Sequence, residues 1–356
     1  MDRRKWVFDN LVALSKIENG KYVLFDKLPK RILVWGTGKY GESVACILEE
    51  LHISPLAFLD SNERKHGGRF HSIKILDPLI ALEEYKDACI LLAMSSANAT
   101  EPKKILKCLA RNYMDIWDFI LCGLNKSISI LEIGPLYCPM FKGDNVKYLD
   151  VYDVPKLREI AKSLNASDED VPKKIDYVSP NGDWCNINES FNIIYSSHVI
   201  EHQTDLIQHF TDVFSHIRSG GAYVLVIPDK RYCFNHYDPE TTMEDVLDAY
   251  YERRTRHSLR ALLRAACGTH NDAQRHWQGN HGIQVEHSMD EFHNVVDAYK
   301  SSITGEYIDC HEWYFTPNSF KITMERLRKA GFVEYSDLLI ENTPENSFEF
   351  YACFRL

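Results

Sequence analysis

The segment FNIIYSSHVIEHQTDLIQHFTDVFSHIRSGGAYVLVIPDKR, residues 191–231, decides the fold of this chain. Its first five residues and residues 222–227 are apolar runs with the length of buried strands. Between them, apolar residues recur at helical spacing from Leu206 to Ile217, and Gly220-Gly221 is a typical end for such a helix. Because strand, helix and strand follow one another within about 35 residues, the segment predicts a βαβ unit and a parallel sheet.

Polar residues follow both predicted strands of this segment. Ser196-Ser197-His198 comes after the first strand, and Pro228-Asp229-Lys230-Arg231 comes after the second. In parallel α/β sheets, ligands bind beyond the carboxyl ends of the strands. We therefore expect the chemistry of the protein at these two positions.

The composition is that of an ordinary globular protein, with 45% apolar and 26% charged residues. A chain of 356 residues is long enough for two domains. The net charge of −10 argues against a general nucleic-acid binder, and the cysteines include no C-x-x-C pair of a zinc ribbon. No apolar run reaches the ~18 residues of a membrane span, and the N-terminus lacks the features of a signal peptide. We expect a cytoplasmic protein, and the sequence leaves a monomer and a homodimer open.

The N-terminal part carries a nucleotide-binding pattern. A predicted strand at 31–35 is followed by GTGKYG, then by a predicted helix and a second strand at 56–59. This is G-x-G-x-x-G between a strand and a helix, with an acid about 20 residues further on, as dinucleotide sites require. The alternative is that the glycines serve only a tight turn and close helix packing. We predict a Rossmann-like domain over residues 1–122, with the candidate ligand-binding residues Gly36, Gly38, Gly41 and Asp60.

This domain resembles the small N-terminal nucleotide-binding domain of bacterial sugar acyltransferases. The resemblance rests on the GTGKYG loop, on FLDSN at 58–62 and on IKILDP at 73–78. It implies a nucleotide or nucleotide-sugar ligand rather than hydride chemistry. No catalytic Tyr-x-x-x-Lys follows, since Tyr85-Lys86 lacks that spacing.

A second series of strands and helices begins after the linker at 121–127. Glu132 lies within a predicted strand at 128–133 that ends at Gly134-Pro135, and a strand at 146–149 ends at Asp150. A third strand is predicted at 175–178, before the two strands of the opening segment. Near the C-terminus, Thr316 is predicted to cap a helix that begins at Pro317 and runs to about Lys329. Two final strands, at 334–340 and 348–356, are close enough in sequence to form an antiparallel pair.

Residues 127–356 resemble the class I S-adenosylmethionine (SAM)-dependent methyltransferases. The resemblance rests on LEIGP at 131–135, YLD at 148–150, SHVIEH at 197–202 and SGG at 219–221. Within that family, the chain looks like a subfamily from bacterial surface-polysaccharide assembly, through IPDKRYCF at 227–234, YIDCHEWYFTPNSF at 307–320 and NSFEF at 346–350. The resemblance implies an α/β protein with two doubly wound Rossmann-like domains. The second would be a seven-stranded methyltransferase sheet with a helical, acceptor-binding insertion at 232–315.

The resemblance also implies roles for individual residues toward the cofactor SAM. Asp150 would accept the ribose hydroxyls, Gly134 would let the backbone approach the cofactor, and Glu132 would orient the loop or the cofactor amino group. The second and third glycines of the family are replaced by PLYCP at 135–139. The second acid of the family falls at Pro180, which leaves Asp183 as the replacement. The candidate SAM-binding residues are therefore Glu132, Gly134, Pro135, Asp150, Asp183 and Ser197.

His198-Val199-Ile200-Glu201-His202 matches the H-x-x-E-H zinc motif literally. We do not interpret it as a zinc site, because a metalloprotease needs this pattern inside a helix and here it spans a strand end. His198 is the first candidate for a catalytic base, since an imidazole can take the proton of an attacking hydroxyl. The alternative is that His198 and His202 only cap the helix and hydrogen-bond to the cofactor loop.

The insertion at 232–315 is rich in histidine, arginine and aromatic residues, which suits a hydroxylated or phosphorylated sugar. Asp309 and His311 are further catalytic candidates. A divalent metal held by His281, Asp309 and His311 is one alternative, and a solvated helical lid is another. The polar residues that define the insertion are Arg253, Arg254, Arg256, His257, His270, His276, His281, His287, Asp309 and His311.

These patterns predict a SAM-dependent O-methyltransferase that acts on a glycan or nucleotide-linked sugar of surface polysaccharide. The first alternative is a bifunctional enzyme whose N-terminal domain performs NAD(P)-linked chemistry. The second is a non-catalytic scaffold that binds SAM or a nucleotide.

Overall fold

The computed structural model of the chain describes residues 3–14, 17–18, 21–22, 25, 28–95, 98–168, 171–180, 182–286, 288–303, 305 and 308–356. The chain forms two units. The smaller unit is Val7–Lys126, and the larger unit is Ser127–Leu356 together with Met1–Trp6. Helix α1 (Arg3–Leu14) therefore begins in the larger unit and continues in the smaller one.

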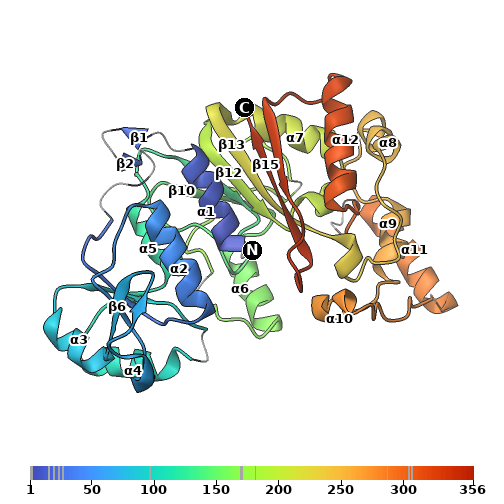
Figure 1. Ribbon diagram of the computed structural model, residues 1–356. Helices are drawn as coiled ribbons and strands as arrows, with labels where there is room; N and C mark the ends of the chain where they lie inside the picture. The colour runs from blue at the N-terminus through green and yellow to red at the C-terminus, as the bar shows by residue number, and fades with distance from the viewer. Residues whose placement is uncertain are drawn as a thin grey trace. The chain divides into compact units, whose positions relative to one another are not determined.

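The smaller unit contains a six-stranded sheet in the order β5-β6-β4-β3-β7-β8 (Figure 1). All neighbouring strands are parallel except β5, which is antiparallel to β6. The strands are β3 (Ile32–Trp35), β4 (Ala57–Leu59), β5 (Arg69–Phe70), β6 (Ile73–Leu76), β7 (Cys89–Leu92) and β8 (Tyr113–Met114). The helices are α2 (Lys39–Glu50), α3 (Pro78–Glu84), α4 (Thr100–Cys108) and α5 (Ile116–Gly123), and a two-stranded sheet pairs β1 (Ile17–Glu18) with β2 (Lys21–Tyr22).

The larger unit contains a seven-stranded sheet in the order β11-β10-β9-β12-β13-β15-β14. Neighbouring strands from β11 to β13 are parallel, whereas β15 is antiparallel to both β13 and β14. The strands are β9 (Ile130–Ile133), β10 (Val146–Asp150), β11 (Tyr177–Val178), β12 (Phe191–Ser197), β13 (Ile217–Pro228), β14 (Asp337–Glu341) and β15 (Glu349–Arg355). The predicted fold class is confirmed: the protein is α/β, with two doubly wound sheets, the second of seven strands.

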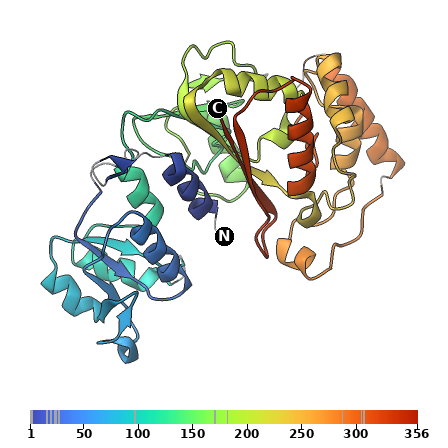
Figure 2. The same cartoon turned by 45° about the horizontal axis from the view of Figure 1, so that its top comes forward.

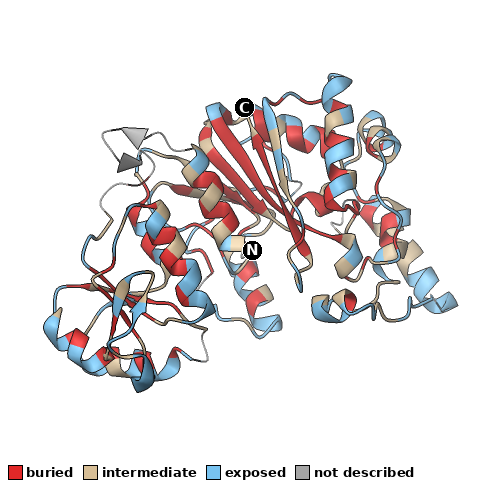
Figure 3. Ribbon diagram, viewed as in Figure 1, coloured by how far each residue is buried: buried red, intermediate tan, exposed pale blue. Residues whose placement is uncertain are grey.

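The core of the larger unit lies between its sheet and the helices α6 (Val154–Ser163), α7 (Leu206–Ser215) and α12 (Pro317–Lys329). The inner strands β9, β12, β13 and β15 are buried along most of their length, whereas the edge strands β11 and β14 are only partly covered (Figure 3). Thr316 caps α12 with Pro317 at its first position, as predicted, because the Thr316 hydroxyl accepts the N–H of Ser319. No helix among the described ranges is both long and apolar enough to cross a bilayer.

The prediction that the helix extends to Ile217 and ends at Gly220-Gly221 is wrong. Helix α7 ends at Ser215, and Ile217 already belongs to β13. The pairing of β12 with β13 shifts between Phe191 and Ile193, where β13 holds extra residues. Gly220 has a φ of +76°, and a Cβ on Gly221 would lie 2.5 Å from the carbonyl oxygen of Asn192. The glycines therefore allow an irregularity inside a strand rather than the end of a helix.

The insertion after β13 folds into the helices α8 (Met243–Glu252), α9 (Leu259–Ala265), α10 (Ala273–Trp277) and α11 (Met289–Ile303). Helix α8 contacts α7 and α12, and α9 contacts α11. Two views show α8, α9 and α11 beside α12 (Figures 1 and 2). The insertion is thus helical, as predicted, and is attached to the helical layer of the larger unit.

Candidate active site

The candidate site lies at the carboxyl ends of β10, β9 and β12, which are neighbours in the larger sheet. Gly134 follows β9 with a φ of +63°, a conformation that favours glycine. A Cβ at this position would lie 2.8 Å from Cγ2 of Val199, which follows β12. The turns after these two strands are therefore in close contact at Gly134.

Glu132 is buried in β9 and shapes the loop that follows Gly134. Its carboxylate accepts the backbone N–H groups of Met140, at 2.7 Å, and of Phe141, at 2.9 Å. Burial raises the pKa of Glu132 to about 8, and these two hydrogen bonds only partly offset that effect. Because each of its oxygens accepts a backbone N–H of the loop, Glu132 holds the shape of that loop.

Asp150 is the last residue of β10 and is buried. One carboxylate oxygen accepts the N–H of Tyr152 at 2.9 Å, and the other accepts a long bond, 3.4 Å, from the N–H of Leu136. Burial raises the pKa of Asp150, and backbone hydrogen bonds work against that shift. The second oxygen is therefore well placed to accept hydroxyl groups of a ligand.

The remaining predicted SAM-binding residues lie around this edge. Pro135 is buried in the turn after Gly134, and Ser197 is the last, half-buried residue of β12. Asp183 lies in the connection between β11 and β12, where it is exposed and accepts the N–H of Cys185 at 3.2 Å.

His198 follows β12 with a φ of +55°, an uncommon conformation for a residue with a side chain. Its Nε2 lies 2.8 Å from Oε1 of Glu349, and its Nδ1 lies 3.3 Å from Oε1 of Glu201. Burial would lower the pKa of His198, but the two carboxylates outweigh it and raise the pKa to about 9. A protonated imidazole cannot accept a proton, so the structure does not support His198 as the catalytic base.

Glu349 joins His198 to the N-terminal helix. Arg3 donates to both oxygens of the Glu349 carboxylate through its guanidinium. Burial would raise the pKa of Glu349, but the bonds from His198 and Arg3 lower it to about 2. His198 is thus held as one member of a chain of charges that also contains Glu201, Glu349 and Arg3.

His202 and His311 lie side by side, with ring centroids 4.7 Å apart and nearly perpendicular rings. Nδ1 of His202 lies 2.8 Å from Oδ1 of Asp309, and Nδ1 of His311 lies 2.7 Å from Oδ1 of Asn235. The structure therefore brings the two predicted residues Asp309 and His311 together around His202. Burial, the main cause, lowers the pKa of His311 to about 4, so its ring is neutral near pH 7.

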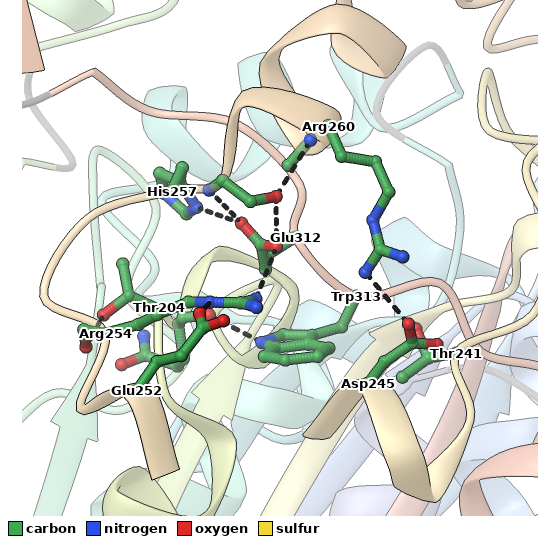
Figure 4. Close-up of polar contacts among 12 residues, drawn as sticks. Thr204, Thr241, Asp245, Glu252, Arg254, His257, Arg260, Glu312 and Trp313 are labelled. Carbon is green, nitrogen blue, oxygen red and sulfur yellow. Dashed lines mark hydrogen bonds and ion pairs between the residues drawn. The ribbon is translucent and has the colours of Figure 1, made fainter. Parts of the chain in front are cut away.

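Glu312 anchors the segment that carries His311 (Figure 4). Its buried carboxylate accepts from the backbone N–H of Ser258 at 2.8 Å and from the Ser258 hydroxyl at 2.7 Å. Arg254 lies 3.4 Å from the same carboxylate, and the backbone N–H of Glu312 donates to the carbonyl of Glu201 at 2.7 Å. These bonds fix the segment against both the insertion and the turn after β12.

A cavity of about 910 Å³ opens beside this site, within the ~300–1,000 Å³ range of small-molecule sites. Its walls come from the end of β10, the connection before β12, the start of α7 and the insertion. The turn after β12 also contributes, through His202. Lining residues from these parts of the chain are Val151, Asp183, His202, His209, Arg256 and Ile308.

The metal set considered from the sequence, His281 with Asp309 and His311, is wrong. His281 stacks on His236, with ring centroids 3.7 Å apart, and its Nδ1 lies 3.1 Å from Nδ1 of His276. Asp309 and His311 lie with His202 instead. His287 lies outside the described residues.

In the smaller unit, the glycines of the GTGKYG loop differ in what surrounds them. A Cβ on Gly36 would lie 2.3 Å from the carbonyl oxygen of Ala93, and one on Gly41 would lie 2.4 Å from that of Gly36. A Cβ on Gly38 would meet nothing within 4 Å. Gly36 and Gly41 are therefore required by packing, and only Gly38 faces open space.

Asp60 follows β4 and already has partners. Its carboxylate accepts from the hydroxyl of Thr37, from Nζ of Lys65 at 2.7 Å and from the N–H of Asn62 at 2.9 Å. Burial would raise the pKa of Asp60, but the bonds from Lys65 and Thr37 lower it. A ribose would have to share or replace these contacts.

Several residues of the site were not singled out from the sequence. Glu201 lies in SHVIEH at 197–202 and Glu312 lies in YIDCHEWYFTPNSF at 307–320, so both stand in segments that carry the resemblance, whereas Arg3 belongs to no motif. Glu349 lies in NSFEF at 346–350, so that part of the subfamily resemblance contained a usable signal.

Comparison with known proteins gives matches of limited extent. The family described as "C2185-like, N-terminal" matches residues 28–113. No curated protein matches the chain.

Three solved structures illustrate the similarities. A UDP-D-quinovosamine 4-dehydrogenase from Vibrio fischeri is 25% identical, with a TM-score of 0.22 over 27% of this chain and 88% of that one. A putative SAM-dependent methyltransferase from Listeria monocytogenes is 11% identical, with a TM-score of 0.31 over 64% of this chain and 90% of that one. A SAM-dependent methyltransferase from Clostridium acetobutylicum ATCC 824 is 11% identical, with a TM-score of 0.32 over 78% and 96%. Similarity at this level does not establish a function, and the fold assignment rests on the observed strand order.

Proposed function

We propose that the larger unit is a SAM-dependent methyltransferase. The observation that supports it best is the pairing of Asp150 with the Gly134 turn at the ends of two adjacent strands. A carboxylate oxygen with spare hydrogen-bonding capacity suits the ribose hydroxyls of SAM. Gly134 gives the backbone access to the cofactor, in a loop whose shape is fixed by the buried Glu132. Pro135, Ser197 and Asp183 would contribute further contacts.

The acceptor is an oxygen of a glycan or nucleotide-linked sugar of surface polysaccharide. The cavity beside the site is lined by the insertion, which contributes Arg254, Arg256 and His257. Guanidinium groups suit hydroxylated and phosphorylated ligands because they donate several hydrogen bonds in one plane. The methyl group would pass by direct displacement, with positioning of the two ligands as the main contribution.

Proton removal falls to the pair formed by His202 and His311 rather than to His198. His311 is neutral near pH 7 and hydrogen-bonds through Nδ1, so its Nε2 carries the lone pair. Asp309 orients His202 in the same way. Burial would lower the pKa of His202, but Asp309 and Glu201 raise it. His311 is therefore the member of the pair that would accept the proton near pH 7.

The smaller unit would bind a nucleotide or nucleotide-sugar. Support comes from the open space at Gly38, which is the residue before the first turn of α2, and from the anion preference of a helix start. Asp60 would exchange its bond with Thr37 or Lys65 for a ribose hydroxyl.

Calorimetry with S-adenosylhomocysteine tests the cofactor assignment. Asp150→Ala should weaken binding by about tenfold or more, ~1.4 kcal/mol or above, since hydrogen bonds to a charged group contribute roughly 1.5–3 kcal/mol. Asp153→Ala is the matched control, because Asp153 is exposed and only caps α6. Equal affinity of Asp150→Ala and the wild type would contradict the assignment. Mass spectrometry of small molecules retained by the purified protein would then identify the ligands directly.

A further inference from the structure

A second property of the site follows from three side chains that the methyl-transfer proposal leaves partly unused. Glu201, His202 and His311 each place one donor atom within 4.8 Å of the others. Glu201 and His202 come from the turn after β12, and His311 comes from the segment before α12, more than a hundred residues later. One carboxylate and two imidazoles form a common ligand set for transition metals, with open positions left for water or substrate.

Glu201 is the observation that points to a missing partner. Its side chain is 1% exposed, yet among the described residues neither of its carboxylate oxygens accepts a hydrogen bond. Its nearest charged neighbours are Nδ1 of His198 at 3.3 Å and Nε2 of His202 at 4.0 Å. A buried carboxylate is costly unless it is paired and hydrogen-bonded, because burial removes its water. The charge of Glu201 is thus paired with the imidazolium of His198 on one side only. A cation between Glu201, His202 and His311 would supply the ligand contacts that its oxygens lack among the described residues.

The two imidazoles present the right nitrogen atoms. Nδ1 of His202 donates to the carboxylate of Asp309, so in the neutral ring that a metal would bind, Nε2 carries the lone pair on the side of Glu201. The amide nitrogen of Asn235 donates to Asp238 at 2.8 Å, which turns the Asn235 oxygen toward His311. Nδ1 of His311 must therefore donate, and in the neutral ring its Nε2 carries the lone pair. Such hydrogen bonds from the outer nitrogen are characteristic of metal-bound histidines.

A second histidine cluster in the larger unit lacks these features. His236, His276 and His281 also lie close together. However, Nε2 of His276 donates to the carbonyl of His270 at 3.0 Å, and its Nδ1 lies 3.1 Å from Nδ1 of His281. Nδ1 of His236 is taken by the carbonyl of Arg231 at 2.7 Å. Hydrogen bonds within the protein account for this cluster, and it contains no carboxylate.

We propose that Glu201, His202 and His311 bind a divalent first-row transition cation, with Asp309 and Asn235 as positioning residues. Two imidazoles favour zinc, cobalt or iron over magnesium and calcium, which prefer oxygen ligands. Ligands at ~2.0–2.2 Å from a tetrahedral ion lie roughly 3.4 Å apart, so the 4.0 Å between Glu201 and His202 needs only a small adjustment.

The cation would lie beside the cavity, since His202 lines it. An acceptor hydroxyl in that cavity could then bind to the ion, which would lower the pKa of the hydroxyl so that its proton passes to water. With the ion bound, this route would replace proton removal by the free imidazoles of His202 and His311. This role rests on the proposed methyltransferase function, whereas the binding of the ion does not.

Titration of the untagged, chelator-treated full chain with Co²⁺ or Zn²⁺, without SAM or sugar, tests the site. Co²⁺ should give a visible absorption band that saturates at one ion per chain, and Zn²⁺ should compete for it. His202→Ala and His311→Ala should each weaken binding by about tenfold or more, and Asp309→Asn by roughly 10–100-fold. The nearly isosteric Glu201→Gln should also lose affinity, with circular dichroism as the check that it folds.

His236→Ala is the matched control, because it alters the second cluster and should leave binding unchanged. The proposal is overturned if the wild type binds neither ion, if His202→Ala and His311→Ala bind like the wild type, or if only His236→Ala weakens binding. Because the titration contains no SAM, its failure would leave the methyltransferase proposal standing. If Asp150→Ala bound S-adenosylhomocysteine as tightly as the wild type, the proposed metal site would likewise be unaffected.

Discussion

Acidification should destabilise the larger unit through one buried histidine in the segment that decides the fold. His209 lies on α7 and is 4% exposed. Its Nε2 is 2.9 Å from the hydroxyl of Tyr223, which is 2.8 Å from the hydroxyl of Ser196. Burial lowers the pKa of His209 to about 3, because the charged form would lose its water without gaining a counter-ion.

The size and sign of the effect follow from this shift. In the unfolded chain the imidazole titrates near 6.5, so below that pH the unfolded state binds a proton that the folded state does not. The free energy of unfolding should then fall by about 1.4 kcal/mol per pH unit below ~6.5. Between about pH 7.5 and about pH 5, His209 should account for a loss of about 2 kcal/mol.

His209→Gln isolates this contribution, since glutamine can still hydrogen-bond to Tyr223 but does not titrate. Hydrogen exchange in urea, followed in peptides that cover β12 and β13, reports on the larger sheet alone. The difference in free energy of unfolding between wild type and variant should change by about 2 kcal/mol between the two pH values. Other titrating groups cancel in this difference. If both proteins lose the same stability on acidification, the assignment of a neutral buried His209 is refuted.

Two further substitutions test the site. Gly134→Ala should lower the melting temperature of the larger unit by roughly 2–8 °C. A left-handed alanine costs about 1–2 kcal/mol, and its methyl group would press on Val199. Calorimetry measures the melting temperature, and an unchanged value would contradict the predicted strain at this turn. Glu312→Gln should destabilise by about 3–5 kcal/mol, because it removes a buried charge that accepts from Ser258 and lies beside Arg254. Urea unfolding measures that loss, and a loss below ~1 kcal/mol would argue against the network shown in Figure 4.

Local sequence context predicted those parts of the fold that depend on local interactions. Helix α12 could be placed because Thr316 and Pro317 are specific to a helix start. The end of α7 could not, because Gly220-Gly221 is compatible with either a helix end or a distorted strand. Only the backbone of Asn192 in the neighbouring strand decides between them, and that contact is not encoded near the glycines.

The site shows the same division. Gly134 and Asp150 could be placed at the ends of neighbouring strands, because Gly134 directly follows β9 and Asp150 is the last residue of β10. The contacts of His198 could not be predicted from its motif. His198 contacts Glu349, and Glu349 in turn binds Arg3, which lies 346 residues away in the sequence. Its pKa depends on these partners and on burial, neither of which the motif contains.

The H-x-x-E-H segment illustrates why spacing alone was misleading. In a helix, His198 and His202 would share one face and bind the same ion. In this structure His198 has a left-handed backbone, and residues 200–202 form a tight 3-10 turn, so the rings separate. His198 contacts Glu349, whereas His202 contacts Asp309 and lies beside His311. The segment is not helical, which agrees with rejecting a helical zinc site. In the metal site proposed above, Glu201 and His202 would be joined by His311 in place of His198.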